Sequence, residues 1–387
     1  MTLIDLPMPS VASSLVEEAE GRLETSLAGD LPTQLVDRFG RVHRDLRISL
    51  TDRCSLRCTY CMPADGVPWL EKDSILTTDE LLRVATVAAS LGITEVRLTG
   101  GEPLLRRDVV EVVRRMAEIP LSRGSNVGGA DVRGSTGPRG GGIETSRPDH
   151  LEVSITTNGL RLAELARPLR DAGLARVNIS IDTLRADRFA ALTRRDRLDD
   201  VLAGIDAAVA AGFAPIKLNA VPMRRVNDDE FVELVRFAMS KGASLRFIEQ
   251  MPLDAGHTWD RAEMVTGEEI LAALSAEFEL TPVGERGSSP AEVFAIDGGP
   301  ATVGVIASVT APFCGACDRV RLTADGQIRN CLFAREESNL LPLLRGGAAD
   351  DDIARVLVAS IAGKRAGHGI DEPGFLQPQR PMSAIGG

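Results

Sequence analysis

The chain has 387 residues, of which 44% are hydrophobic and 26% charged, so it can form one large or two moderate domains with a packed core. Acidic residues outnumber basic ones by 55 to 44, and the net charge of −11 excludes a global basic field for nucleic acid. No apolar run is long enough to span a membrane, and the N-terminus lacks the pattern of a secretory signal. We therefore expect a cytoplasmic protein with neither a nucleic-acid nor a membrane partner.

The first part of the chain predicts an arm followed by a repeating strand–helix pattern. Residues 1–36 are rich in Ser, Pro and acidic residues, which is typical of a flexible arm. Short β-branched or Leu-rich strands are expected at 46–50, 95–99, 152–156, 176–181, 215–221 and 245–249. Helices are expected between them at 78–91, 107–118, 161–172, 199–211 and 228–240. This alternation predicts an α/β fold with a parallel sheet, and six units predict a partial (β/α)6, TIM-like barrel over residues 37–252.

One segment interrupts the alternation. Residues 121–149 are dense in Gly, Ser, Arg and Pro and carry few apolar side chains. We expect a flexible surface insertion here, whose arginines are solvated rather than bound to a phosphate.

The pattern changes after residue 252. A helix near 267–278 is followed by strands at 292–296, 301–308 and 319–323 and a last helix near 351–363. The tripeptide Ala-Asp-Gly at 324–326 is typical of a hairpin turn. Residues 253–387 are therefore expected to form a second, smaller α+β domain.

The cysteines indicate two metal sites. All six fall into two triplets, which are Cys54, Cys58 and Cys61 (the first triplet) and Cys314, Cys317 and Cys331 (the second triplet). An odd triplet disfavours disulfides, which are also rare in the cytosol. Structural zinc remains open but needs a fourth ligand, and His43 and His257 lie at no typical spacing from either triplet. Three thiolates instead suit a [4Fe–4S] cluster in which one iron lacks a protein ligand.

The first triplet, spaced CxxxCxxC with Tyr60 before its third cysteine, resembles the radical S-adenosylmethionine superfamily. The resemblance implies that S-adenosylmethionine completes the coordination of the open iron. Gly100 and Gly101 belong to a GGEP stretch that follows the second expected strand and allows close backbone approach to a ligand. A plain strand–helix turn would also favour glycine there, but after a CxxxCxxC strand the stretch resembles the part of the superfamily that holds the methionine amino group.

The motifs together narrow the resemblance. CxxxCxxC, GGEP, the distal second triplet and the terminal MSAIGG resemble the GTP 3′,8-cyclase family of molybdenum cofactor biosynthesis, from about residue 37 onward outside 121–149. The resemblance implies that the C-terminal domain carries a second [4Fe–4S] cluster whose open iron meets the guanine base of GTP.

The resemblance also implies particular site residues. Positions near S-adenosylmethionine are Tyr60, Gly101, Ser180 and Met251. Positions that contact GTP are Arg47, Arg97, Thr156, Lys217, Arg319, Val320 and Arg321. Catalytic positions are Arg319, Arg321, Gly386 and Gly387. Apart from the resemblance, Lys217 lies within an apolar strand, where an ammonium is costly unless it meets an anion; the other positions would by default be strand packing, a solvated strand face or a frayed tail.

The implied reaction begins when an external one-electron donor reduces the first cluster. A 5′-deoxyadenosyl radical then takes the 3′ hydrogen atom of GTP, and C3′ bonds to guanine C8. The next enzyme of the pathway forms cyclic pyranopterin monophosphate, and a homodimer is possible. Two other interpretations stay open: a peptide-modifying radical S-adenosylmethionine enzyme with an auxiliary cluster, and a non-enzymatic protein with two structural metal sites.

Overall fold

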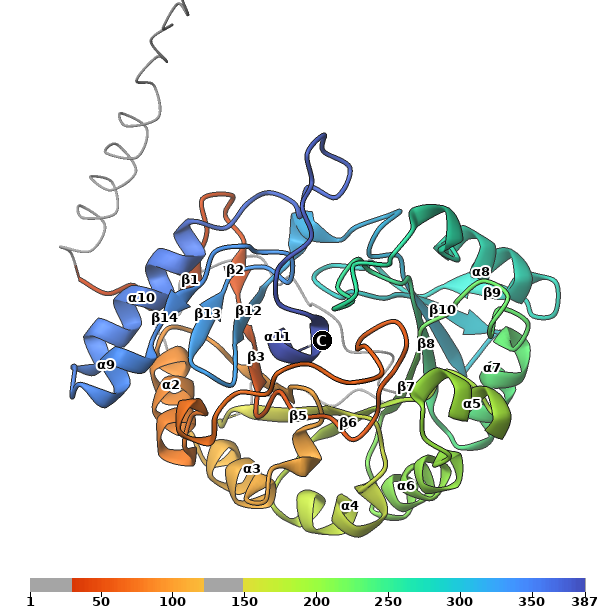
Figure 1. The fold of residues 1–387 in the computed structure, drawn as a ribbon, viewed down its shortest axis with the longest axis horizontal. Helices are drawn as coiled ribbons and strands as arrows, with labels where there is room; N and C mark the ends of the chain where they lie inside the picture. Colours follow the sequence, from red (N-terminus) through yellow and green to blue (C-terminus); the bar gives the residue numbers. More distant parts are fainter. Residues whose placement is uncertain (1–29, 122–148, 387) are drawn as a thin grey trace, which may run out of the picture.

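The structure is a computed structural model that describes residues 30–121 and 149–386 (Figure 1). Most of the expected arm, the interior of the 121–149 insertion and Gly387 lie outside the described residues. Within the described residues, no helix has both the length and the apolar character needed to cross a membrane.

The expected strand–helix alternation is confirmed. The six expected strands are β3 (Asp45–Ser49), β4 (Glu95–Thr99), β5 (Glu152–Thr157), β6 (Arg176–Ser180), β7 (Ile216–Ala220) and β8 (Ser244–Ile248). The five expected helices are α2 (Thr78–Ser90), α3 (Val109–Ala117), α4 (Leu162–Asp171), α6 (Leu198–Ala210) and α7 (Phe231–Ser240). A sixth helix, α5 (Ala186–Thr193), was not expected from the sequence.

Residues after 252 complete the same sheet. The elements there are α8 (Gly267–Ser275), β9 (Leu280–Pro282), β10 (Glu292–Ile296), β11 (Thr302–Ile306), β12 (Arg319–Leu322), β13 (Gln327–Arg329), β14 (Ser338–Asn339), α9 (Leu341–Arg345), α10 (Asp350–Ala362) and α11 (Met382–Ile385). A small hairpin of β1 (Leu35–Val36) and β2 (Val42–His43) precedes the barrel.

Apart from the β1–β2 hairpin, the described strands form one large sheet in the order β14-β13-β12-β3-β4-β5-β6-β7-β8-β11-β10-β9. Strand β12 pairs parallel to β3, and β11 pairs parallel to β8. The second region thus extends both edges of the barrel sheet rather than forming a sheet of its own. The expected hairpin is present, because Leu322 pairs with Ile328 across the turn. The two ends of the sheet, β14 and β9, do not pair with each other among the described residues, so the barrel is partial.

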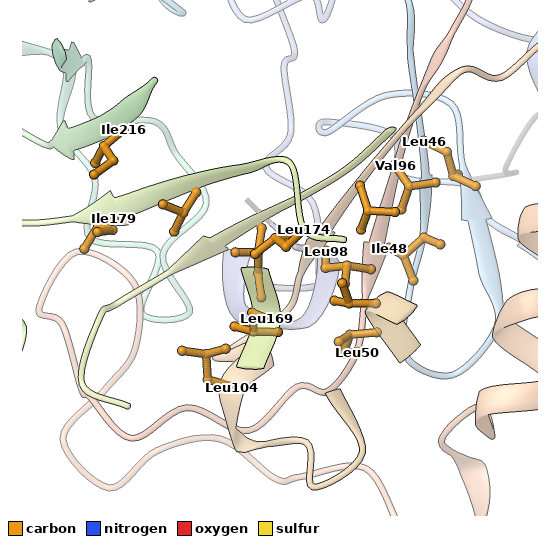
Figure 2. Close-up of a cluster of buried hydrophobic side chains, with 14 of the residues drawn as sticks. Leu46, Ile48, Leu50, Val96, Leu98, Leu104, Leu169, Leu174, Ile179 and Ile216 are labelled. Carbon is orange, nitrogen blue, oxygen red and sulfur yellow. The ribbon is translucent and has the colours of Figure 1, made fainter. Parts of the chain in front are cut away.

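The outer face of the sheet packs against the helices. Figure 2 shows this core, in which the fully buried side chains of Leu46, Ile48, Val96 and Leu98 gather in one cluster. Leu169 of α4 packs in the same cluster. Because side chains alternate along a strand, the residues between these apolar positions face the barrel interior.

The inner face carries charged rows that the strand register aligns. Arg321 of β12 pairs with Arg47 of β3, Arg47 pairs with Arg97 of β4, and Arg97 pairs with Ser154 of β5. We call Arg321, Arg47 and Arg97 the arginine row. Three neighbouring strands therefore present three guanidinium groups to the same interior space.

The C-terminal segment enters this interior. Figure 1 shows α11 and the end of the described chain in the middle of the barrel. Met382 N donates to Leu253 O at 2.9 Å, and the Arg321 guanidinium donates to Gly386 O. The tail thus lies beside the arginine row.

Candidate active site

Both cysteine triplets open onto one cavity of about 340 Å³ inside the barrel. The cavity lining includes all six cysteines. It also includes the following positions expected from the sequence: Arg47, Tyr60, Arg97, Gly101, Thr156, Ser180, Met251, Arg319 and Arg321. Residues from opposite ends of the chain are thereby brought to a single site.

The loop that carries the first triplet follows β3 and is fixed by backbone hydrogen bonds. Cys61 N donates to Cys58 O at 3.0 Å, which closes a turn between two of the three thiols. Arg57 N and Thr59 N donate to backbone oxygens of Thr193 and Leu192 at 2.9 Å each. The end of α5, the helix missed from the sequence, therefore holds this loop in place.

The GGEP stretch packs directly on the same loop. Gly101 N donates to Thr51 O at 2.8 Å, and a Cβ atom at Gly101 would clash with the backbone oxygens of Asp52 and Arg53. The Glu102 carboxylate accepts hydrogen bonds from Thr157 Oγ1 and Asn158 N, both at 2.7 Å, and from Leu104 N at 2.9 Å. The two glycines permit the close approach, and the buried glutamate fastens the turn to the end of β5.

The surroundings of the first triplet are acidic and dry. Burial raises the pKa of all three thiols, that of Cys58 well above its usual value and that of Cys61 to about 12. Nearby carboxylates add to this, with Asp182 acting on Cys58 and Glu102 on Cys54. The thiolate forms therefore need a positive partner, which bound iron would supply.

Asp182 also organises the cavity wall above the first triplet. Tyr60 OH donates to Asp182 Oδ2 at 2.8 Å, and Val221 N donates to Oδ1 at 2.8 Å. Burial raises the pKa of Asp182 to about 6, although both hydrogen bonds oppose this shift. The only tyrosine of the chain is thus fixed by a carboxylate at the end of β6.

The second triplet has cationic surroundings instead. Burial would raise the pKa of Cys317, but the charges of Lys364 and Arg319 outweigh it and lower that pKa. Arg319 Nη1 lies 3.8 Å from Cys317 Sγ, and Lys364 Nζ lies 3.6 Å from the same sulfur. Cys317 is thus easier to ionise than an isolated thiol, whereas burial raises the pKa of Cys314 in the same triplet.

The guanidinium groups of the arginine row repel one another. Burial lowers the pKa of Arg47 well below its usual value, and the charges of Arg97 and Arg321 lower it further. Burial also lowers the pKa of Arg321, to about 10. Asp45 opposes part of this charge, at 3.8 Å from Arg47 and 3.6 Å from Arg319. A bound polyanion would relieve the remaining repulsion.

Four expected positions lie outside the cavity lining. Lys217 shares the inner face of β7 with Asn219, which does line the cavity, but lies one step deeper. Val320 is fully buried in the outer core, so its side chain faces away from the cavity. Gly386 is buried between Ser49 and Thr99 beside Arg321, and Gly387 lies outside the described residues.

Sequence reasoning missed other cavity residues, including Asp182, Asn219 and Arg246. The alternation of side chains along a strand places them on the inner face. Asp182 lies two residues after Ser180 and shares its side, and Arg246 of β8 pairs with Asn219 of β7. Burial lowers the pKa of Arg246 to about 9, and the charge of Arg97 adds to that effect. Arg246 therefore extends the cationic surface toward β8.

The donor chemistry of both triplets fits iron–sulfur clusters. Each triplet offers three thiols at the cavity edge, and within residues 30–121 and 149–386 no group of three Cys, His, Asp or Glu side chains is arranged to hold a single metal ion. A cluster distributes its protein ligands over different irons, so it does not need three donors around one point. Three thiols that line an open cavity leave one coordination position free, which suits a cluster better than a closed, four-ligand structural zinc site.

Comparison with known proteins agrees with this chemistry. Residues 48–238 match the family model of the radical SAM (S-adenosylmethionine) superfamily, and residues 243–370 match the model described as Molybdenum Cofactor Synthesis C. The GTP 3′,8-cyclase of Streptomyces coelicolor is 53% identical over 356 residues, which cover 91% of this chain and 96% of that protein. The GTP 3′,8-cyclase of Mycolicibacterium smegmatis is 49% identical over the full length of both chains.

A solved structure shows the same fold. Streptococcus suis SuiB, in a crystal structure bound to S-adenosylmethionine, superposes with a TM-score of 0.54 at 13% identity. The match covers 94% of this chain and 75% of that one. At this identity the likeness concerns the fold alone.

A partial parallel barrel with a CxxxCxxC loop at the carboxyl end of its first strand defines a radical S-adenosylmethionine enzyme. The relatives that match nearly the whole chain at about half identity define the family more narrowly. The chain belongs to the GTP 3′,8-cyclase family.

Proposed function

We propose that the chain converts GTP to (8S)-3′,8-cyclo-7,8-dihydroguanosine 5′-triphosphate, the first step of molybdenum cofactor biosynthesis. The observation that carries the proposal is the shared cavity, which both cysteine triplets and the arginine row line. S-adenosylmethionine, the source of the radical, and GTP would bind in the same space. The family relationship supports the same reaction.

The first triplet would hold a [4Fe–4S] cluster and S-adenosylmethionine. When bound, this cluster supplies the electron that cleaves S-adenosylmethionine to methionine and a 5′-deoxyadenosyl radical. Gly101 lines the cavity and would offer its backbone to the methionine end of the cofactor. Tyr60, Ser180 and Met251 line the same part of the cavity and would position the rest of the cofactor.

The arginine row would bind the triphosphate of GTP. Arg47 and Arg97 lie side by side on β3 and β4, so their guanidinium groups can share adjacent phosphates. Lys217 and Thr156, on β7 and β5, would extend this contact, and each pairs directly with Asn178 on β6. Val320 would contribute through its backbone only, because its side chain lies in the outer core.

The guanine base would lie toward the second triplet, which would hold the second [4Fe–4S] cluster. Arg319 lies beside Cys317 and Arg321 beside the tail, so both would line the space around the base and ribose. In the product the C3′ hydrogen atom would have been lost to the radical cofactor, and C3′ would be bonded to guanine C8. One electron and one proton complete the product. The contribution of the chain is to hold C3′ near both the radical carbon and C8.

The C-terminal tail would act in this step. Gly386 is seated beside Arg321, and Gly387 follows it directly. We assign both residues a catalytic role through the orientation of Arg321 and the exclusion of water from the cavity.

The remaining parts of the proposal concern partners and organisation. An external one-electron donor would reduce the clusters, and a following enzyme would form cyclic pyranopterin monophosphate. We keep the domain division at residue 252, a cytoplasmic location and a possible homodimer as parts of this proposal.

A product assay tests the function. The protein is reconstituted anaerobically with iron and sulfide and then given reductant, S-adenosylmethionine and GTP. We expect 5′-deoxyadenosine together with an isomer of GTP that carries the C3′–C8 bond, detected by chromatography and mass spectrometry. Formation of 5′-deoxyadenosine with unchanged GTP would contradict the assigned substrate.

A further inference from the structure

Lys364 lies behind the second triplet, just after the end of α10. Its side chain is buried, with 3% of the residue exposed. Its ammonium nitrogen lies 2.7 Å from Arg319 O, 2.9 Å from His43 Nε2, 3.4 Å from Cys317 O and 3.6 Å from Cys317 Sγ. An ammonium group removed from water is costly unless it has hydrogen-bond partners and a counter-ion.

The group best placed to balance the charge of Lys364 is the sulfur of Cys317, 3.6 Å from the ammonium nitrogen. Across residues 30–121 and 149–386, the ammonium forms no ion pair with a carboxylate, and the negative charges that act on it most are those of Cys317 and Cys331. Burial lowers the pKa of Lys364, and attraction to these two sulfurs opposes that shift. A [4Fe–4S] cluster held by three thiolates is net negative and becomes more negative on reduction.

His43 orients the ammonium. Lysine carries only donors, so His43 Nε2 must accept this hydrogen bond and the imidazole must be neutral. Burial lowers the pKa of His43 to about 4, and the Lys364 charge lowers it further. The neutral imidazole can therefore accept a hydrogen bond from the ammonium without adding a second positive charge.

The β1–β2 hairpin fixes both partners. Arg41, within this hairpin, donates to Cys314 O at 2.6 Å, to Arg365 O at 2.7 Å and to Ala366 O at 3.0 Å. Asp37 accepts from Arg41 Nε at 2.5 Å and thereby sets the guanidinium plane. The turn that carries Lys364 and the loop that carries Cys314 are joined by one side chain.

We propose that Lys364 is a positioning residue of the second triplet: its ammonium, oriented by His43, donates to the Cys317 sulfur and acts as the built-in counter-ion of the second cluster. It stabilises the reduced cluster relative to the oxidised one, because the added electron lies close to a buried positive charge. The first triplet has carboxylates near its thiols, where the second triplet has this lysine. This inference rests on the second cluster of the proposed function.

The test isolates the second cluster. Cys54, Cys58 and Cys61 are replaced by alanine in the full chain, and iron, sulfide and the cluster reduction potential are measured, the last by EPR-monitored redox titration. Lys364→Met removes the ammonium at nearly constant length. Arg365→Met is the matched control, because it removes one positive charge at the next position from an exposed side chain paired with Glu372.

We expect Lys364→Met to make cluster reduction at least tenfold less favourable, a shift of about 59 mV toward negative potential. Arg365→Met should match the parent protein, and Lys364→Arg should retain most of the parent potential. Equal potentials in Lys364→Met and the parent would overturn the proposal while leaving the proposed function intact. A parent that binds no iron through Cys314, Cys317 and Cys331 would overturn both.

Circular dichroism and the melting temperature show whether Lys364→Met is folded. If Lys364→Met does not fold, Lys364→Gln is used instead, since its amide can still donate a hydrogen bond. The same negative shift is expected from Lys364→Gln. An unshifted potential in that variant would equally overturn the role of Lys364.

Discussion

The two cysteine triplets line the same cavity but have opposite electrostatic surroundings. The half-buried thiols of the first triplet lie near Asp182 and Glu102, whereas Cys317 in the second lies within 4 Å of two cationic side chains. A cluster near carboxylates is harder to reduce than one near cations, because the added electron is repelled in one case and attracted in the other. A cluster in the first site would thus be a strong electron donor. A cluster in the second, substrate-binding site would accept an electron more readily.

The division of labour between the triplets predicts the largest effect. Cys54→Ala should abolish 5′-deoxyadenosine formation, because the initiating cluster loses a ligand. Cys314→Ala should retain some uncoupled cleavage of S-adenosylmethionine but lose cyclisation of GTP. Quantifying 5′-deoxyadenosine and cyclised nucleotide in parallel separates the two variants. Full cyclisation by Cys314→Ala would remove the role assigned to the second triplet.

The tail that reaches the space between the triplets predicts the next effect. Gly386 has φ of +74°, and a Cβ there would clash with Ser49 Oγ and Thr99 Oγ1. Gly386→Ala should displace the tail from Arg321 and lower cyclisation by about 10²-fold, as expected when a catalytic geometry shifts by about 1 Å.

The matched control for this variant is Gly347→Ala. Gly347 has a similar φ of +74°, but a Cβ added there would meet no atom within 4 Å. It should therefore share the backbone strain without the clash, and its cyclisation rate should stay near that of the parent protein. Equal rates for the two variants would mean that the tail contact is dispensable.

The cationic surface between the triplets predicts a smaller, pH-dependent effect. Burial, together with the charges of Arg246, Arg176 and Arg97, lowers the pKa of Lys217 to about 7. A bound triphosphate would raise this pKa, so binding takes up a proton above pH 7. The affinity for GTP should be full below about pH 7 and fall by up to about tenfold per pH unit above it.

Isothermal titration calorimetry at several pH values, with S-adenosylmethionine left out, measures this dependence. Lys217→Met should bind GTP more weakly at pH 6 by about tenfold, the loss expected for one charged hydrogen bond. Its affinity should no longer change between pH 7 and 8. Lys241→Met is the control, since Lys241 pairs with Asp206 on the surface. A parent protein with pH-independent affinity would exclude Lys217 from the phosphate site.

The barrel could be predicted from the sequence because its signals are local. Apolar residues at Leu46, Ile48, Val96 and Leu98 alternate with polar ones, and this alternation by itself assigns Arg47 to the inner face of the sheet. The spacing of the six cysteines likewise defines two sites without reference to the fold. These features depend only on neighbours in the chain.

The features that were missed depend on register and tertiary contact. Arg321 joins Arg47 and Arg97 only because β12 pairs with β3, which no local pattern reveals. Helix α5 has no side-chain cap and is short, so it gave a weak signal. The contact between Lys364 and Cys317 joins positions 47 residues apart, and that between Lys364 and His43 spans 321. Such pairs form only when the chain folds.

Transfer of deuterium from GTP labelled at C3′ tests the central claim most directly, because the claim is that GTP and the radical initiator share one cavity. The reconstituted protein is given reductant, S-adenosylmethionine and the labelled GTP, and 5′-deoxyadenosine is analysed by mass spectrometry. We predict one deuterium atom in 5′-deoxyadenosine for each GTP that is cyclised. Unlabelled 5′-deoxyadenosine alongside intact labelled GTP, from protein shown to contain both clusters, would contradict the shared site.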